Sequence, residues 1–116
     1  MHHPLPNYLR THRKRWSLTQ DELAHLLGLT AQVAISQYEL NLRRPGADIL
    51  IGSEVIFGTS IRELFPQVYD QVADAVLARA KALYGRLEAR NDLSASMKLR
   101  LLSDMLQRAD GDIPQV

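Results

Sequence analysis

The sequence contains no cysteine among its 116 residues. Disulfide bonds, zinc sites built on thiolates and cysteine nucleophiles are therefore excluded. No apolar run approaches the roughly 20 residues that a membrane-spanning helix needs. The first residues, Met-His-His-Pro-Leu-Pro, lack the hydrophobic region of a signal peptide. We therefore expect no membrane association and a reducing, cytoplasmic location.

Signals of catalysis and of cofactor binding are missing as well. No histidine, acid and nucleophile fall at a recognisable catalytic spacing, and the sequence has no glycine-rich phosphate loop or other cofactor motif. His3 has the spacing from a free amino terminus that copper- and nickel-binding sites use, but we interpret it, together with His2, as part of a solvated tail. We expect no enzyme activity, no cofactor and no bound metal.

Composition and charge indicate a folded protein whose first part is basic. Apolar residues make up 46% of the sequence, which is enough for a hydrophobic core, and the length fits one domain with a small appendage. Residues 1–44 carry six lysine and arginine residues against three acids, a net charge of +3. Residues 45–116 carry eight against ten, a net charge of −2. A basic surface that faces phosphate groups is therefore expected in the first part of the chain.

One stretch, Thr19 to Glu39, organises that first part. Thr19 precedes a short amphipathic segment, and Glu22 completes a capping box with it. Gly28 stands where this helix must end in a left-handed residue before a sharp turn. A second amphipathic segment, rich in amides, follows the turn, so the stretch predicts two short helices. The spacing of apolar residues places on their buried faces Leu23, Leu26, Leu27, Ile35 and Tyr38.

Three fragments of the sequence together resemble a known family. They read Thr-Gln-x-Glu-Leu-Ala-x-x-Leu-Gly-Leu from residue 19, Ile-Ser-x-Tyr-Glu from residue 35, and Arg-Arg-Pro from residue 43. The chain from Tyr8 to Phe65 is similar in these fragments to the Xre/Cro-type helix-turn-helix of phage repressors and bacterial regulators. The resemblance implies an all-α domain of five helices, in which the helix over 31–40 enters the DNA major groove.

The sequence departs from this family in one place. The segment from Leu29 to Glu39 is one residue longer than the family usually has, so the turn or the start of the recognition helix is enlarged. Counting back from Glu39 places Gln32 and Val33 at the first two helical positions. Counting forward from Gly28 places Ala31 and Gln32 there instead, and both alternatives stay open.

Candidates for contacts with DNA bases lie on this helix. Glutamine can form a bidentate pair with adenine, and a small apolar side chain such as Val33 or Ala34 can touch a thymine methyl group. The candidates for base reading are Ala31, Gln32, Val33 and Gln37.

Candidates for contacts with the DNA backbone come from three places. Arg10 and Arg13 share a face of the first helix, expected over residues 7–16. Gln20 matches a glutamine that, in the family, binds a phosphate and braces the recognition helix. The loop after the recognition helix supplies the remaining candidates, Asn41, Arg43 and Arg44.

Further helices are expected over 48–57, 61–65 and 67–90, with a last one that runs from a cap at Asp92 or Ser94 to about residue 108. Ser60 is the expected cap of the helix at 61–65. Besides the residues above, the expected core includes Leu9, Trp16, Ile49 or Leu50, Val55, Ile56 and Phe57. In 67–90 apolar residues recur at alternating steps of four and three, a heptad seam formed by Tyr69, Ala73, Val76, Ala80, Leu83 and Leu87.

These expectations combine into one prediction of organisation. Residues 1–6 form an arm, residues 7–66 a five-helix repressor-like helix-turn-helix domain, and residues 67–116 a C-terminal helical hairpin. Two helices alone rarely bury such a seam, so we expect a homodimer whose interface includes Val76, Ala80, Leu83, Leu87 and Leu101.

The predicted function is that of a sequence-specific regulator of transcription, with repression as the expected role. Its partner would be double-stranded DNA with a palindromic operator. A function from another class stays open: an antitoxin, or an adaptor that uses the helix-turn-helix fold to bind protein.

Overall fold

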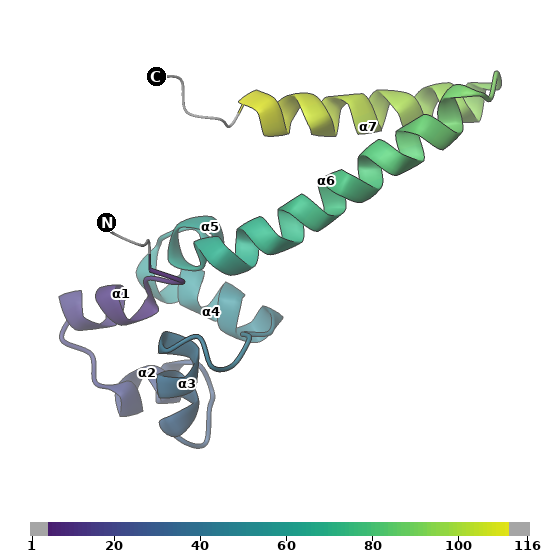
Figure 1. The fold of residues 1–116 in the computed structure, drawn as a ribbon. Helices are drawn as coiled ribbons and strands as arrows, with labels where there is room; N and C mark the ends of the chain where they lie inside the picture. Colours follow the sequence, from purple (N-terminus) through teal and green to yellow (C-terminus); the bar gives the residue numbers. More distant parts are fainter. Residues whose placement is uncertain (1–4, 112–116) are drawn as a thin grey trace. The chain divides into compact units, whose positions relative to one another are not determined.

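The structure is a computed structural model that describes residues 5–111 (Figure 1). His2 and His3 lie outside this range, as does most of the predicted arm. Seven helices and no strand occur in the described range, which confirms the predicted all-α class. The helices are α1 (Leu9–Arg15), α2 (Gln20–Leu26), α3 (Val33–Glu39), α4 (Ala47–Phe57), α5 (Ile61–Leu64), α6 (Pro66–Glu88) and α7 (Leu93–Gly111).

The chain divides into two compact units. The first unit ends at Asp70 and the second begins at Gln71, so the boundary falls inside the continuous helix α6. The first unit contains α1 to α5 and the first turn of α6. The second contains the rest of α6 and α7, which form the predicted C-terminal hairpin.

The starts of several helices are encoded locally, as the sequence predicts. The capping box is present: the Glu22 backbone N–H donates to Thr19 Oγ1 over 3.0 Å, and the Thr19 backbone N–H donates to Glu22 Oε1 over 2.9 Å. The hydrogen bond from the Thr19 backbone N–H lowers the pKa of the Glu22 carboxyl below its usual value, and the Thr19 side chain lowers it further. Ser60 caps α5 by accepting from the backbone N–H of Glu63, and Pro66 occupies the first position of α6.

Helices α1, α2 and α3 all end in the same hydrogen-bonded turn. After each helix the chain passes through a residue with positive φ: Ser17 (58°), Gly28 (72°) and Asn41 (59°). In each case two backbone N–H groups return to the last carbonyls, as in Leu29 N to Ala24 O (2.9 Å) and Gly28 N to His25 O (3.1 Å). This pattern is the Schellman motif, which satisfies carbonyls that a helix end would leave unpaired. It allows helices of only seven residues to stop and turn.

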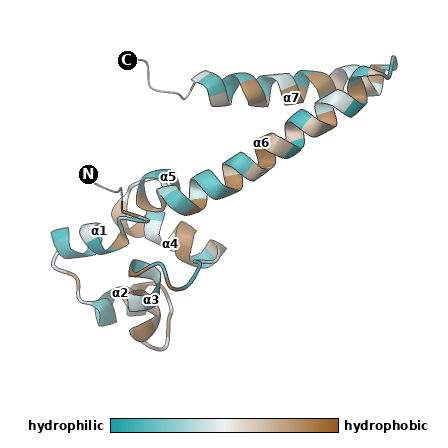
Figure 2. Cartoon of the chain, viewed as in Figure 1, coloured by the Kyte–Doolittle hydropathy of each residue, from teal (hydrophilic) through white to brown (hydrophobic). Residues whose placement is uncertain are grey.

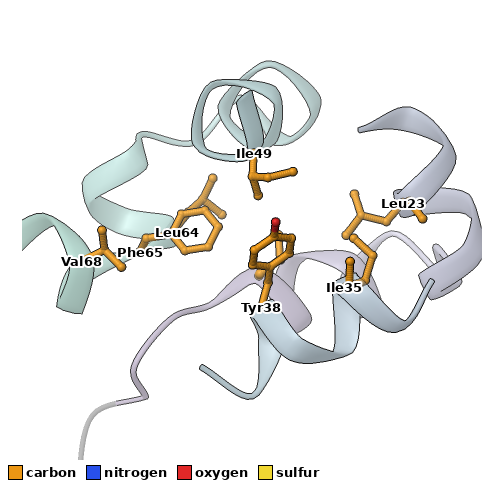
Figure 3. Close-up of a cluster of buried hydrophobic side chains, with 10 residues drawn as sticks. Leu23, Ile35, Tyr38, Ile49, Leu64, Phe65 and Val68 are labelled. Carbon is orange, nitrogen blue, oxygen red and sulfur yellow. The ribbon is translucent and has the colours of Figure 1, made fainter. Parts of the chain in front are cut away.

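The first unit is built around a single hydrophobic core (Figure 3). Apolar side chains from α1 to α5 meet there, and Val68 of α6 joins them. The buried members are Leu9, Leu23, Ala24, Ala34, Ile35, Tyr38, Ile49, Leu64, Phe65 and Val68. Leu27, Leu50, Ile56 and Phe57 are partly buried against this core.

Three residues predicted as core are instead exposed, and helix geometry explains each. Trp16 is 66% exposed because α1 ends one residue before it. Leu26 is exposed because α2 buries Leu23 and Ala24, so its inward face lies away from Leu26. Val55 is 78% exposed because α4 buries Ile49 and Ser53, which are four residues apart on one face.

The second unit has a small core of its own. Ala80 and Leu87 of α6 are buried with Leu102 of α7, and Tyr84, Leu99 and Met105 pack against them. Asp92 begins α7 by accepting from the Ala95 backbone N–H over 2.7 Å, so Asp92 is the cap rather than Ser94. The hydrogen bond from Arg90 lowers the pKa of the Asp92 carboxyl, and the bond from Ala95 contributes further.

The predicted heptad seam is therefore divided between two environments. Ala80 and Leu87 lie inside the hairpin's own core, and the prediction that they contact a partner is wrong. Val76, Leu83 and Leu101 are exposed, in line with the apolar segments that alternate with polar ones along α6 and α7 in Figure 2.

The φ angle at Gly28 yields a prediction about stability. A Cβ at this position would meet no atom within 4 Å, so a Gly28→Ala change acts through the backbone alone. We expect it to lower the free energy of unfolding by about 1–2 kcal/mol, because left-handed φ is unfavourable for alanine. Gly85→Ala, inside α6 with equally open space, should raise it by about 0.5–1 kcal/mol. Urea unfolding followed by circular dichroism measures both, and equal signs would contradict this account.

Candidate nucleic-acid interface

One face of helix α3 is turned to solvent, and it carries both polar and apolar side chains. Val33 and Leu40 are about 60% and 59% exposed, and Ser36 and Gln37 are half-buried between them. The opposite face, with Ala34, Ile35 and Tyr38, is buried in the core. Ala34 therefore cannot serve as the small apolar contact that the sequence suggested beside Val33. Leu40, which the sequence reasoning missed, shares the outward face because it follows Val33 by seven residues.

Helix α3 starts one or two residues later than the two alternatives that the sequence left open. The first helical residue is Val33, and Gln32 precedes it as the N-cap. The Ala31 carbonyl accepts from Ala34 N and the Gln32 carbonyl from Ile35 N, both three residues on, so the first turn is tightened. The connection from Leu27 to Gln32 therefore lies outside the helix, which has seven residues. Ala31 and Gln32 are exposed in that connection.

A buried ion pair joins α3 to α1. Arg13 donates through Nε to Glu39 Oε2 over 2.6 Å and through Nη2 to Glu39 Oε1 over 3.2 Å. The two side chains are 10% and 2% exposed. Gln20 of α2 donates its Nε2 to the same Oε1 over 3.1 Å. One carboxylate therefore ties α1, α2 and α3 together, and Gln20 braces the recognition helix as the resemblance implied.

The burial of Arg13 corrects one predicted site residue. Its third nitrogen, Nη1, donates to the Leu18 carbonyl over 2.9 Å, so all three guanidinium nitrogens bond within the protein. Contact between Arg13 and a phosphate group does not fit this arrangement. The spacing of Arg10 and Arg13 places them on one face of α1, but the sequence carries no signal that Glu39 lies beside Arg13. Arg10 is exposed.

A second buried polar residue was not predicted. Asn7 donates its side-chain N–H to the Tyr38 carbonyl over 2.9 Å and accepts from the Leu9 backbone N–H over 3.2 Å. The same side chain therefore joins the first residue of α1 to the C-terminal end of α3. An asparagine two residues before a helix is a recognisable start signal, but its bond to Tyr38 has no local sequence signal.

The loop after α3 carries the remaining predicted residues. Asn41 adopts positive φ and donates its side-chain N–H to Gln67 Oε1 over 3.3 Å. The Arg43 guanidinium lies 5.4 Å from the centre of the Tyr38 ring, a cation–π contact. Arg43 and Arg44 are both exposed. These side chains and the outward face of α3 belong to one continuous segment of the chain.

Two further features are absent from residues 5–111, the part of the chain that the structure describes. In this range no group of three or more histidine and acidic side chains could hold a metal ion. Within the same range, no helix is both long enough and apolar enough to cross a membrane.

Comparison with known proteins gives one match. The family model described as helix-turn-helix matches residues 9–64, which run from the first residue of α1 to the last residue of α5. No curated protein and no solved structure matches the chain.

The ion pair yields a prediction about stability. Arg13→Met should lower the free energy of unfolding by about 3–5 kcal/mol, because it leaves the buried Glu39 carboxylate without its cationic partner. Arg10→Met, an exposed position on the same helix, should change it by less than about 0.5 kcal/mol. The double variant Arg13→Met/Glu39→Met should be more stable than Arg13→Met, since no buried charge remains. Urea unfolding of the four proteins tests this, and equal effects at positions 10 and 13 would contradict it.

Proposed function

Residues 9–64 belong to the Xre/Cro-type helix-turn-helix family, and on this premise we propose that the protein is a sequence-specific DNA-binding regulator that represses transcription. The family match indicates a DNA-binding regulator. The observation that carries the proposal is the outward face of α3, which offers an amide and apolar side chains while a buried ion pair holds the helix from behind. An α-helix fits the width of the major groove, so the outward face of α3 can lie against base edges.

Base reading is proposed for the exposed residues at the start and on the outward face of α3. Gln32 and Gln37 offer amide groups that can pair with adenine, and Val33 can touch a thymine methyl group. Ala31 lies just before them in the connection and contributes a small contact surface.

Backbone contacts are proposed for residues on both sides of α3. Gln20 contacts a phosphate by donating the second N–H of its Nε2, the one that does not bind Glu39. Asn41, Arg43 and Arg44 contact the backbone beyond the C-terminal end of α3, and Arg10 supplies charge from α1. These contacts set the orientation of the helix, whereas the glutamines set the sequence preference.

Homodimerisation is proposed for residues 67–116. A single domain of this size reads few base pairs, and a dimer on a palindromic operator places two recognition helices about 34 Å apart. Val76, Leu83 and Leu101 supply exposed apolar surface for such an interface. Residues 7–66 then act as the DNA-binding domain, with residues 1–6 as an arm.

The base-reading role yields the experiment that tests the function. A duplex is first selected from a random pool by its binding to the protein. Gln32→Ala and Gln37→Ala should each cost about 1–3 kcal/mol of binding free energy on this duplex and leave binding to random DNA unchanged. Arg44→Ala is the matched control: it should weaken both duplexes alike and lower the salt slope by about one unit. Failure to select any duplex would contradict sequence-specific binding, and equal losses on both duplexes would remove that glutamine as a base reader.

The dimer yields a separate prediction. Sedimentation at micromolar concentration should give about twice the chain mass of 13.1 kDa. Leu83→Asp should give a folded monomer with weaker operator binding, because Leu83 is exposed on α6. Leu87→Asp should instead lower the helix content, because Leu87 is buried in the hairpin core. A wild-type mass near 13.1 kDa would contradict the dimer, and copurification of a second small protein would favour an antitoxin or adaptor.

A further inference from the structure

The connection between α1 and α2 displays an unusual side chain. Trp16 is 66% exposed, although tryptophan side chains are usually well buried. It is the chain's one tryptophan. An indole ring in solvent leaves a large apolar surface and one N–H donor without protein cover, and such residues are enriched where proteins contact partners.

The backbone beneath Trp16 is held in a fixed conformation. Ser17 has a φ of +58°, a conformation that costs free energy in residues other than glycine. Two backbone bonds fix the turn, Ser17 N to Lys14 O and Leu18 N to Arg13 O, each 3.0 Å long. Arg13 Nη1 also donates to the Leu18 carbonyl. Because Arg13 is bound to Glu39 as well, the connection is tied to the end of α3 through one side chain.

The charge around Trp16 indicates the kind of partner. The helix that ends beside it reads Leu-Arg-Thr-His-Arg-Lys-Arg and contains no acid. Arg10, Lys14 and Arg15 are exposed on it, whereas Arg13 is neutralised by Glu39. A stretch of seven residues, 10–16, with three exposed cations and one exposed indole suits a polyanion that also offers apolar groups. The sugar-phosphate backbone of DNA has both properties.

We propose that Trp16, Lys14 and Arg15 form an additional contact with duplex DNA, separate from the base-reading face of α3. The indole ring packs against deoxyribose and its N–H donates to a phosphate oxygen, while the two cations lie against neighbouring phosphates. This inference rests on the proposed function, because it adds a contact to the same complex. It widens the footprint beyond Gln20, which follows Trp16 by four residues.

The single tryptophan allows a direct test on the wild-type full-length protein. A fluorescently labelled duplex, selected from a random pool, is titrated with protein while its anisotropy is recorded. In a parallel titration, indole emission is excited at wavelengths that the four tyrosines do not absorb. The emission should change in intensity or wavelength with the same midpoint as the anisotropy. A random duplex bound at low salt should change the emission in the same way.

Variants measure how much the contact contributes. Trp16→Ala should weaken binding to both the selected and the random duplex by roughly three- to tenfold, the value of one hydrogen bond with its packing. Its salt slope should stay unchanged because no charge is lost. Lys14→Ala and Arg15→Ala should each lower the slope by about one unit. Val55→Ala, at an exposed apolar position on α4, is the control and should leave binding unchanged.

The outcomes separate this inference from the proposed function. If the anisotropy rises while the indole emission and the affinity of Trp16→Ala stay unchanged, the additional contact is overturned and DNA binding stands. If the anisotropy never rises, both are overturned. If the emission changes with protein concentration in the absence of DNA, and not on adding DNA, Trp16 contacts another copy of the chain and the inference is again overturned.

Discussion

The ion pair between Arg13 and Glu39 determines how the first three helices are arranged. Each of these helices has seven residues, too few to be stable alone in water. Their orientation must come from contacts between them, and apolar packing alone tolerates small rotations. A carboxylate that accepts two bonds from Arg13 and one from Gln20 admits far fewer arrangements. The base reading proposed for α3 needs such a fixed orientation, because hydrogen bonds to base edges depend strongly on distance and angle.

The turns between these helices restrict the arrangement of α1, α2 and α3 further. Ser17, Gly28 and Asn41 each reverse the chain within a few residues, so helices that follow one another in sequence can pack closely. Glycine adopts positive φ without strain, and asparagine does so at a modest cost. Serine has no such preference, so the conformation at Ser17 depends on the bonds made by Arg13 and its neighbours. Packing and local backbone geometry are thus mutually dependent in this unit.

The features that the sequence predicted well are those decided within a few residues. The Thr19–Glu22 capping box, the left-handed Gly28 and the Ser60 cap need no knowledge of distant parts. The exposure of Trp16, Leu26 and Val55 depends on where neighbouring helices lie, which spacing does not reveal. The bond from Asn7 to Tyr38 spans 31 residues and that from Arg13 to Glu39 spans 26. For the same reason the heptad seam could not show that α7 covers Ala80 and Leu87 while Leu83 stays exposed.

The bond from Asn41 to Gln67 has a consequence for regulation. Asn41 ends the recognition helix, and Gln67 belongs to the first turn of α6, a helix that continues without interruption to Glu88. Where DNA also binds these two states, bond made or bond broken, with different affinities, a molecule that favours one state changes the affinity for DNA. Linkage then requires that DNA change the affinity for that molecule by the same factor. The amide pair is therefore a place where a signal can be exchanged in both directions, with a coupling limited to the small free energy of one exposed hydrogen bond.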